Sequence, residues 1–159
     1  MAEFTIPELS MTENPPVGFH FLVTFFIGGI VPNPLDLRFK KVSGISSEIE
    51  IISQKEGGEN LYVHRLPNRV SYNNLTLERG MVIGSPLNIE FNVAMSSLRL
   101  NPGNVLVALL NDDSIPISAW LFLKTYPVKW MVSNLDATQN SVVIETMELA
   151  YTRFQSFRI

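Results

Sequence analysis

Apolar and polar side chains alternate with a period of two along several stretches of the chain, which is the pattern of β-strands with one buried face. The most apolar stretch is residues 17–27, which is rich in β-branched and aromatic residues. One face of this expected strand carries Phe19, Phe21, Val23, Phe25 and Ile27. Because the opposite face is also mostly apolar, we expect this strand to be covered and not left at a solvated edge.

Further strands are expected at residues 38–42, 45–53, 61–66, 71–79, 105–110, 117–126 and 142–151. The separators are turns at Val31-Pro32-Asn33-Pro34 and Asn111-Asp112-Asp113, a break at Pro67-Asn68, and a polar loop at 136–141. Residues 54–60 are polar and contain Gly57-Gly58, which predicts a flexible hairpin tip. Prolines at 7, 15 and 16 predict an extended arm over residues 1–16.

Residues 85–100 fit both a strand and a helix. Apolar residues alternate from Leu87 to Met95, yet Leu87, Phe91, Ala94, Met95 and Leu98 also form a helical stripe. Ser85-Pro86 is an N-cap followed by proline at the first helical position, and Asn101-Pro102-Gly103 is a stop signal. We therefore predict a helix that packs through Leu87, Phe91, Met95 and Leu98.

These elements amount to seven or eight strands and one helix. The expected fold is mainly β, an antiparallel β-barrel or sandwich with one packed α-helix. A chain of 159 residues suits one domain, spanning 1–159 with the arm at 1–16.

Hydrophobic residues make up 46% of the chain and charged residues only 17%, below the quarter typical of soluble domains. Such a balance fits a well-packed β protein, or a subunit whose apolar surface is buried between copies.

The net charge of −3 gives no indication that the chain binds nucleic acid. The absence of cysteine excludes disulfides and fits assembly in a reducing cytoplasm. The start of the chain lacks a signal peptide's basic region, and the apolar segment 17–31 is shorter than the ~20 residues of a membrane span.

No catalytic or metal-binding pattern stands out. His20 and His64 are the only histidines, and neither has a second ligand at metal spacing. Glu48 and Glu50 share one strand face, and Glu145 shares a face with Met147. We interpret these alternating acids as the hydrated face of each strand. Gly57-Gly58 lacks the lysine and helix of a phosphate loop, and Ser43, Ser46 and Ser47 have no histidine partner. We therefore expect no enzyme activity and no cofactor.

Several segments nevertheless occur in an order that resembles a known family. They are Pro15-Pro16-Val17-Gly18-Phe19-His20-Phe21-Leu22-Val23, Phe39-Lys40-Lys41-Val42-Ser43-Gly44-Ile45, Gly57-Gly58-Glu59-Asn60, Leu75-Thr76-Leu77-Glu78-Arg79-Gly80, Ile117-Ser118-Ala119-Trp120, Tyr126-Pro127-Val128-Lys129 and the closing strand 140–151. Along nearly its whole length the chain resembles the contractile phage tail tube protein family, the inner tube proteins of phage tails and related contractile injection systems.

The resemblance implies a structural protein whose hexameric rings stack into a hollow tube inside a contractile sheath. The implied partners are other copies of the chain, the sheath protein, the baseplate hub or initiator, the tail terminator, and DNA or a protein effector in the lumen. The implied location is a virion tail or an extracellular injection particle assembled in the bacterial cytoplasm, without membrane insertion by this chain alone.

Two alternatives stay open. Family members usually have a tryptophan within the segment occupied here by residues 89–92, and often one at the position of Tyr126. The chain therefore also fits a tube initiator, a baseplate ring of the same fold. A small β-barrel ligand-binding protein is the other alternative, and it predicts a stable monomer.

Two surfaces are the candidate interfaces. In related tube proteins a hairpin corresponding to residues 46–60 reaches the neighbouring ring, which predicts that the apolar Ile49 and Ile51 dock while acids point outward. The predicted ring-stacking residues are Glu48, Ile49, Glu50, Ile51, Lys55, Glu56 and Glu59. The predicted ring-closing strand carries Phe19, Phe21, Val23 and Phe25.

Overall fold

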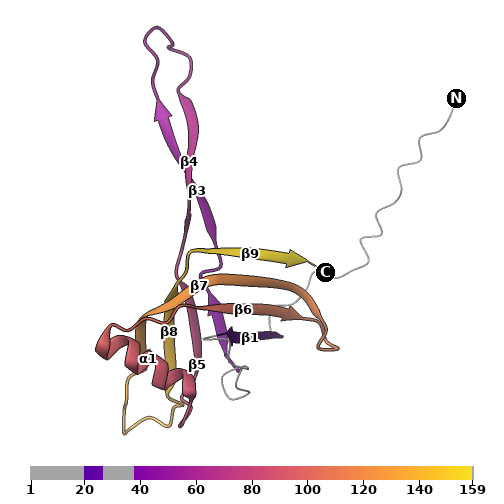
Figure 1. Cartoon of the computed structure of the whole chain (residues 1–159), viewed down its shortest axis with the longest axis vertical. Helices are drawn as coiled ribbons and strands as arrows, with labels where there is room; N and C mark the ends of the chain where they lie inside the picture. The colour runs from indigo at the N-terminus through magenta and orange to yellow at the C-terminus, as the bar shows by residue number, and fades with distance from the viewer. Residues whose placement is uncertain (1–19, 27–37, 159) are drawn as a thin grey trace, which may run out of the picture.

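One antiparallel sheet that bends on itself forms the body of the protein (Figure 1). The structure is a computed structural model and describes residues 20–26 and 38–158. Along the sheet the order is β1 (Phe21–Phe26), β6 (Gly103–Leu110), β7 (Pro116–Val132), β8 (Ile144–Ala150), β5 (Leu75–Gly80) and β2 (Lys41–Ser43). A further strand, β9 (Arg153–Arg158), pairs with β7. The fold is mainly β with one helix, as predicted.

The bend lies within β7, which has 17 residues. Its first part pairs with β6 and β9, and its second part pairs with β8 from Tyr126 onward. Between them, Lys124 has a left-handed backbone with φ 52. This change of direction lets one long strand belong to both halves of the sheet, which then face each other across the core.

The core lies between the two halves and under the helix. Its buried residues come from five strands and α1 and are Val23, Leu75, Leu77, Leu87, Phe91, Val105, Val107, Phe122, Met147 and Leu149. The alternation of side chains along a strand directs these residues toward the core, as in β5 and β8, where every second side chain is buried.

The helix α1 (Pro86–Ser97) begins as the sequence predicts, because the Ser85 side chain accepts a hydrogen bond from the Asn88 N–H. It buries Leu87, Phe91 and Ala94. The predicted contacts through Met95 and Leu98 are wrong, since these side chains are 43% and 84% exposed. The helix ends before Leu98, which adopts a left-handed cap, and Met95 lies at the margin of the stripe.

Several predicted strand boundaries are also wrong. Pro67-Asn68 is not a break but lies inside β4 (His64–Tyr72), and Asn73-Asn74 separates β4 from β5. Proline is tolerated there because β4 has only one neighbour, β3 (Ser47–Gln54). The strand β9 was not predicted, and β7 continues six residues past Tyr126. The predicted arm at 1–16, the turn at 31–34 and both ends of the strand at 17–27 lie outside the described residues.

The short turn at Asn111 is confirmed, and its chemistry is visible. The Asn111 side-chain oxygen accepts hydrogen bonds from the N–H groups of Asp113 (3.0 Å) and Ile115 (2.8 Å). Ser114 takes the left-handed conformation with φ 61. This is a side-chain-stabilised turn of the kind that Asn favours.

Candidate functional site: assembly surfaces

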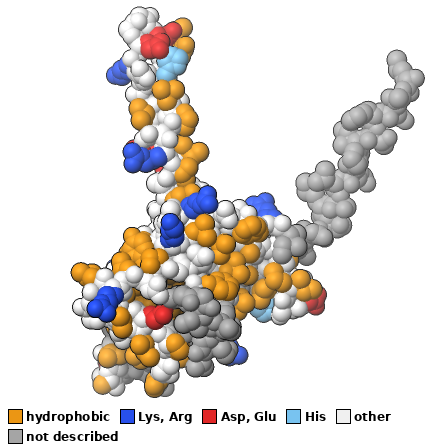
Figure 2. All heavy atoms as spheres, viewed as in Figure 1, with side chains coloured by type: hydrophobic (Ala, Val, Ile, Leu, Met, Phe, Trp, Pro, Cys, Tyr) orange, Lys and Arg blue, Asp and Glu red, His pale blue; other side chains and the backbone are white. Residues whose placement is uncertain are grey.

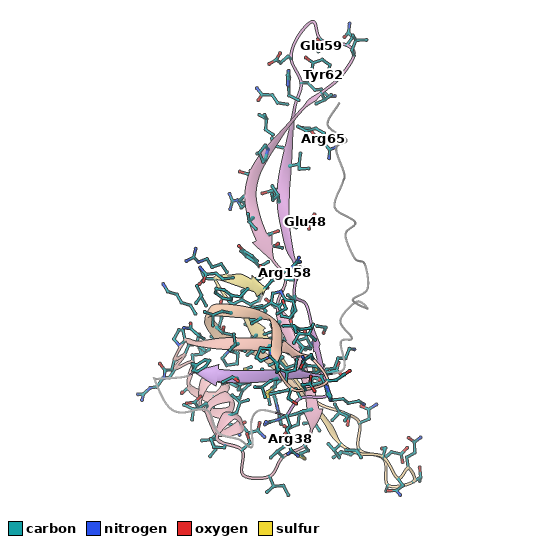
Figure 3. The ribbon with its side chains drawn as sticks, turned by 90° about the vertical axis from the view of Figure 1, so that its right-hand side faces the viewer. Arg38, Glu48, Glu59, Tyr62, Arg65 and Arg158 are labelled. Carbon is teal, nitrogen blue, oxygen red and sulfur yellow. The ribbon has the colours of Figure 1, made fainter. Side chains whose placement is uncertain are left out.

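A two-stranded hairpin of β3 and β4 projects from the body, with Tyr62 and Glu59 near its end and Glu48 near its root (Figure 3). Every residue of β3 is exposed, as is nearly all of β4. Hydrophobic side chains run along the hairpin (Figure 2). An isolated hairpin is at best marginally stable in water, so its exposed apolar side chains indicate a surface that another molecule covers.

The two faces of the hairpin differ in chemistry. Ile49 lies opposite Val70, and Ile51 lies opposite Pro67, which puts four apolar residues on one face. Ile49 and Ile51 are 56% and 49% exposed. The expected alternation of these isoleucines with Glu48 and Glu50 is therefore confirmed, and their role in ring stacking stays a prediction.

The face that carries the acids also carries apolar residues. Ile52, which alternation puts on the same side as Glu50, lies opposite Leu66, and both are about half exposed. Glu50 accepts a hydrogen bond from Asn68 (2.7 Å) and lies 3.7 Å from the Arg69 guanidinium. Asn68 and Arg69 carry the extra residue of a β-bulge, because β4 advances three positions while β3 advances two.

The tip of the hairpin holds its predicted charged residues in internal contacts. The Glu56 carboxylate lies 3.4 Å from the His64 ring, and the Glu59 carboxylate accepts a hydrogen bond from the Leu61 N–H (3.0 Å). Next to them Leu61 is 91% exposed and Tyr62 57% exposed. Sequence reasoning assigned Leu61-Tyr62-Val63 to a strand, so it missed this apolar end. The signal was present in three large apolar residues directly after a polar, glycine-containing loop.

Hydrogen bonds and close packing fix the root of the hairpin to the body. Asn73 donates to the Ser46 hydroxyl (2.8 Å), and Asn74 donates to the Glu148 carboxylate of β8 (2.8 Å). Gly44 has φ +87, and a Cβ at this position would collide with the Asn74 carbonyl oxygen. Only glycine fits both constraints, so Gly44 lets the two chains of the root approach closely.

An aromatic cluster completes the root. The Tyr72 ring lies 5.8 Å from Tyr151 and 5.5 Å from Phe154, and the Tyr151 ring lies 4.8 Å from Phe122 in the core. Burial raises the pKa of the Tyr151 hydroxyl, and the nearby Tyr72 adds to this rise. Through these rings the last residue of β4 is connected to the core.

The predicted ring-closing residues of β1 face inward. Val23 is fully buried, and Phe21 and Phe25 are half-buried against the core, so these side chains serve the fold. Phe19 lies outside the described residues. Apolar alternation identified the correct face but could not distinguish a core from an interface. Among the described strands β1 pairs only with β6, which makes its backbone a terminal edge of the sheet.

The interpretation of Glu145 as a hydrated acid is wrong. Its side chain is fully buried, and Arg79 lies opposite it in the pairing of β5 with β8, with Nε 3.2 Å from the carboxylate. Arg79 also donates to the Ser85 hydroxyl (2.9 Å) and to the Asn88 side-chain oxygen (2.8 Å), and Asn88 donates back to Glu145 (3.1 Å). This network connects two strands to the N-terminus of α1. The clue in the sequence was that Glu145 alternates with apolar residues that belong to the core.

Within residues 20–26 and 38–158, no group of three or more histidine, aspartate or glutamate side chains could hold a metal ion. His20 directly precedes β1, and His64 begins β4 at the hairpin tip. No helix in the described part of the chain is long and apolar enough to span a membrane.

The features that stand out are therefore a projecting hairpin with an exposed apolar face and, among the described strands, a terminal sheet edge at β1, which are typical of a structural β protein. Residues 17–155 match the model of the T4-like virus tail tube protein gp19 family. The chain belongs to this tail tube family, whose members are structural proteins.

Solved structures agree with this assignment. A chain in the six-fold symmetrised baseplate of the anti-feeding prophage is 36% identical, with a TM-score of 0.85, and the match covers 92% of this chain and 97% of that one. A chain in the PVC sheath–tube complex is 19% identical with a TM-score of 0.78, covering 93% and 95%. One in the tube-terminating cap of the anti-feeding prophage is 20% identical with a TM-score of 0.78, covering 92% and 93%. No curated protein sequence matched the chain.

Proposed function

We propose that six copies of this chain close into a ring and that such rings stack into the hollow inner tube of a contractile tail or injection particle. The observation that carries this is the hairpin, because its exposed apolar face belongs to a tail tube fold and needs a partner. The 36% identical chain comes from a six-fold symmetrised assembly, which supports six copies in a ring.

Ring closure uses strand edges. The outer backbone edge of β1 is a ready acceptor for a strand of the next subunit, and a head-to-tail contact of this kind closes into a ring when its rotation fits. In this proposal β1 contributes its backbone, whereas Phe21, Val23 and Phe25 hold it on the core.

The proposed partners follow from the related structures, which are a sheath–tube complex, a baseplate and a tube-terminating cap. The ring contacts further copies of itself, the sheath outside, the baseplate hub or initiator at one end and the terminator at the other. DNA or a protein effector passes through the lumen. The particle assembles in the bacterial cytoplasm and functions as a virion tail or an extracellular injection device.

One observation favours a second candidate, a ring at the baseplate end of the tube. The related chain from a baseplate structure is 36% identical, whereas those from the sheath–tube and cap structures are 19% and 20% identical. A baseplate ring shares the fold and the ring contact. It differs because it stacks on a different protein on one side.

Negative-stain microscopy and analytical sizing of the purified chain test the proposal. We expect rings, and long tubes if the chain is the repeating tube subunit. Single rings or ring pairs that do not extend with concentration would identify the baseplate ring. A strict monomer at high micromolar concentration would refute both candidates.

A further inference from the structure

A hollow of about 280 Å³ opens between α1 and the strands beneath it. Phe25 of β1, Val105 of β6 and Pro127 of β7 form its floor, and Ile89 and Val93 of the helix form its wall. Ile89 and Val93 are 63% and 48% exposed, so this wall is open to contact. It is an apolar depression with room for one or two large side chains.

The rim of the hollow is charged. Glu90 and Arg99 line it and are both exposed, which gives one acid and one base around an apolar centre. An occupant that fits this pattern carries an apolar projection with charges of both signs close by.

The hairpin tip has this composition. Leu61 is 91% exposed, Tyr62 and Val63 adjoin it, and Lys55 and Glu59 lie in the same loop. The tip cannot reach the hollow of its own chain, because α1 lies at the opposite end of the molecule along its longest axis (Figure 1). A donor at one end and an acceptor at the other define a head-to-tail contact, which propagates along the axis instead of closing on itself as a dimer would.

We infer that the hollow between α1 and β1, β6 and β7 receives the Leu61-Tyr62-Val63 tip of a second copy in the adjacent ring. This inference rests on the proposed stacking of rings and names the acceptor site for the hairpin. Leu61 enters the hollow against Ile89 and Val93. The charges of the tip meet Arg99 and Glu90 at the rim, and these pairs set the rotation of one ring on the next.

The chain has no cysteine, so single cysteines report on the contact without background. The probe is Val93→Cys, and the matched control is Asn92→Cys, which is exposed on the same helix but does not line the hollow. We expect a soluble maleimide to label Val93→Cys at least tenfold more slowly in assembled protein than in dispersed protein. Asn92→Cys should change much less, and adding Leu61→Ala should restore labelling of Val93→Cys.

A second measurement tests proximity. Tyr62→Cys chains mixed with Val93→Cys chains should give a cross-linked dimer with a short bismaleimide, whereas Tyr62→Cys mixed with Asn92→Cys should not. Unchanged labelling of Val93→Cys in tubes or stacked rings seen by microscopy would overturn the inference and leave the proposed function intact. So would equal protection of both helix positions, or a Val93→Cys that is already unreactive in dispersed protein, since another segment would then fill the hollow. Absence of any assembly would overturn both.

Discussion

The buried pair of Arg79 and Glu145 permits a sharp test of what holds the fold together. Arg79→Met removes the cation and keeps an apolar stem, so Glu145 is left fully buried with its main charge partner gone. Breaking such a pair costs about 3–5 kcal/mol, because the remaining charge is uncompensated. In a domain of this size about 2–4 °C is lost per kcal/mol, so we expect the melting temperature to fall by roughly 6–20 °C.

The control is the neighbouring ion pair, in which Glu78 directly precedes Arg79 in β5 and Lys41 lies opposite Glu78 in β2. Lys41 pairs with Glu78 at 3.5 Å, but the two side chains are 60% and 27% exposed, so Lys41→Met should cost only about 0–1 kcal/mol. The double variant Arg79→Met with Glu145→Met should recover most of the loss, since neither charge then remains buried. The assays are thermal unfolding and urea unfolding of dispersed protein, both followed by tryptophan fluorescence, which give the melting temperature and the free energy of unfolding. An Arg79→Met variant as stable as the parent, or a double variant worse than the sum of its single changes, would refute this reasoning.

Three further predictions concern packing and assembly. Phe91→Ala removes a ring that is only 4% exposed and should cost about 3–5 kcal/mol in the same assay, and a variant that unfolds like the parent would show that the helix is held by other contacts. Gly44→Ala should destabilise by more than about 1 kcal/mol. Gly58→Ala has a similar φ of +95 but no neighbour within 4 Å, so it is the control for backbone strain alone, and equal effects would contradict the proposed collision with Asn74. Replacing residues 54–60 by a two-residue turn should leave rings but block their stacking. Full-length tubes from that variant by electron microscopy would contradict this role, and loss of rings would assign the hairpin to the fold itself.

Period-two alternation and helix punctuation were sufficient to predict the fold class. Ser85-Pro86 defined the start of the helix because capping is a local property that depends on neighbouring residues alone. The helix ends at the left-handed cap of Leu98, before the stop signal at residues 101–103. The bulge at Asn68 and the long course of β7 were missed because they depend on which strand lies alongside. Pairing partners are set by distant residues such as Leu149, opposite Pro127, and no local pattern contains them.

The candidate surfaces were predicted less completely, for a related reason. Alternation separates two faces of a strand but does not say whether a face meets the core, another copy or water. Val23 was therefore assigned to an interface although its side chain lies in the core, and Glu145 was assigned to a hydrated face although it is buried. The hairpin was recognised from Ile49 and Ile51 because β3 keeps regular alternation on an unburied ribbon. Leu61 was overlooked because an exposed apolar side chain is informative only when its surroundings are known.

The root of the hairpin has a mechanical consequence. β3 alone has eight residues, which corresponds to about 26 Å at roughly 3.3 Å per residue. A rotation of only about 10° at Gly44 would therefore move the end of the strand by about 4.5 Å, close to the spacing of neighbouring strands. The backbone conformation of the root therefore determines the position of the hairpin tip, and the length of the hairpin amplifies small changes in it. We expect small changes at Gly44, Asn74 or Tyr72 to misalign stacked rings even where the subunit itself stays folded.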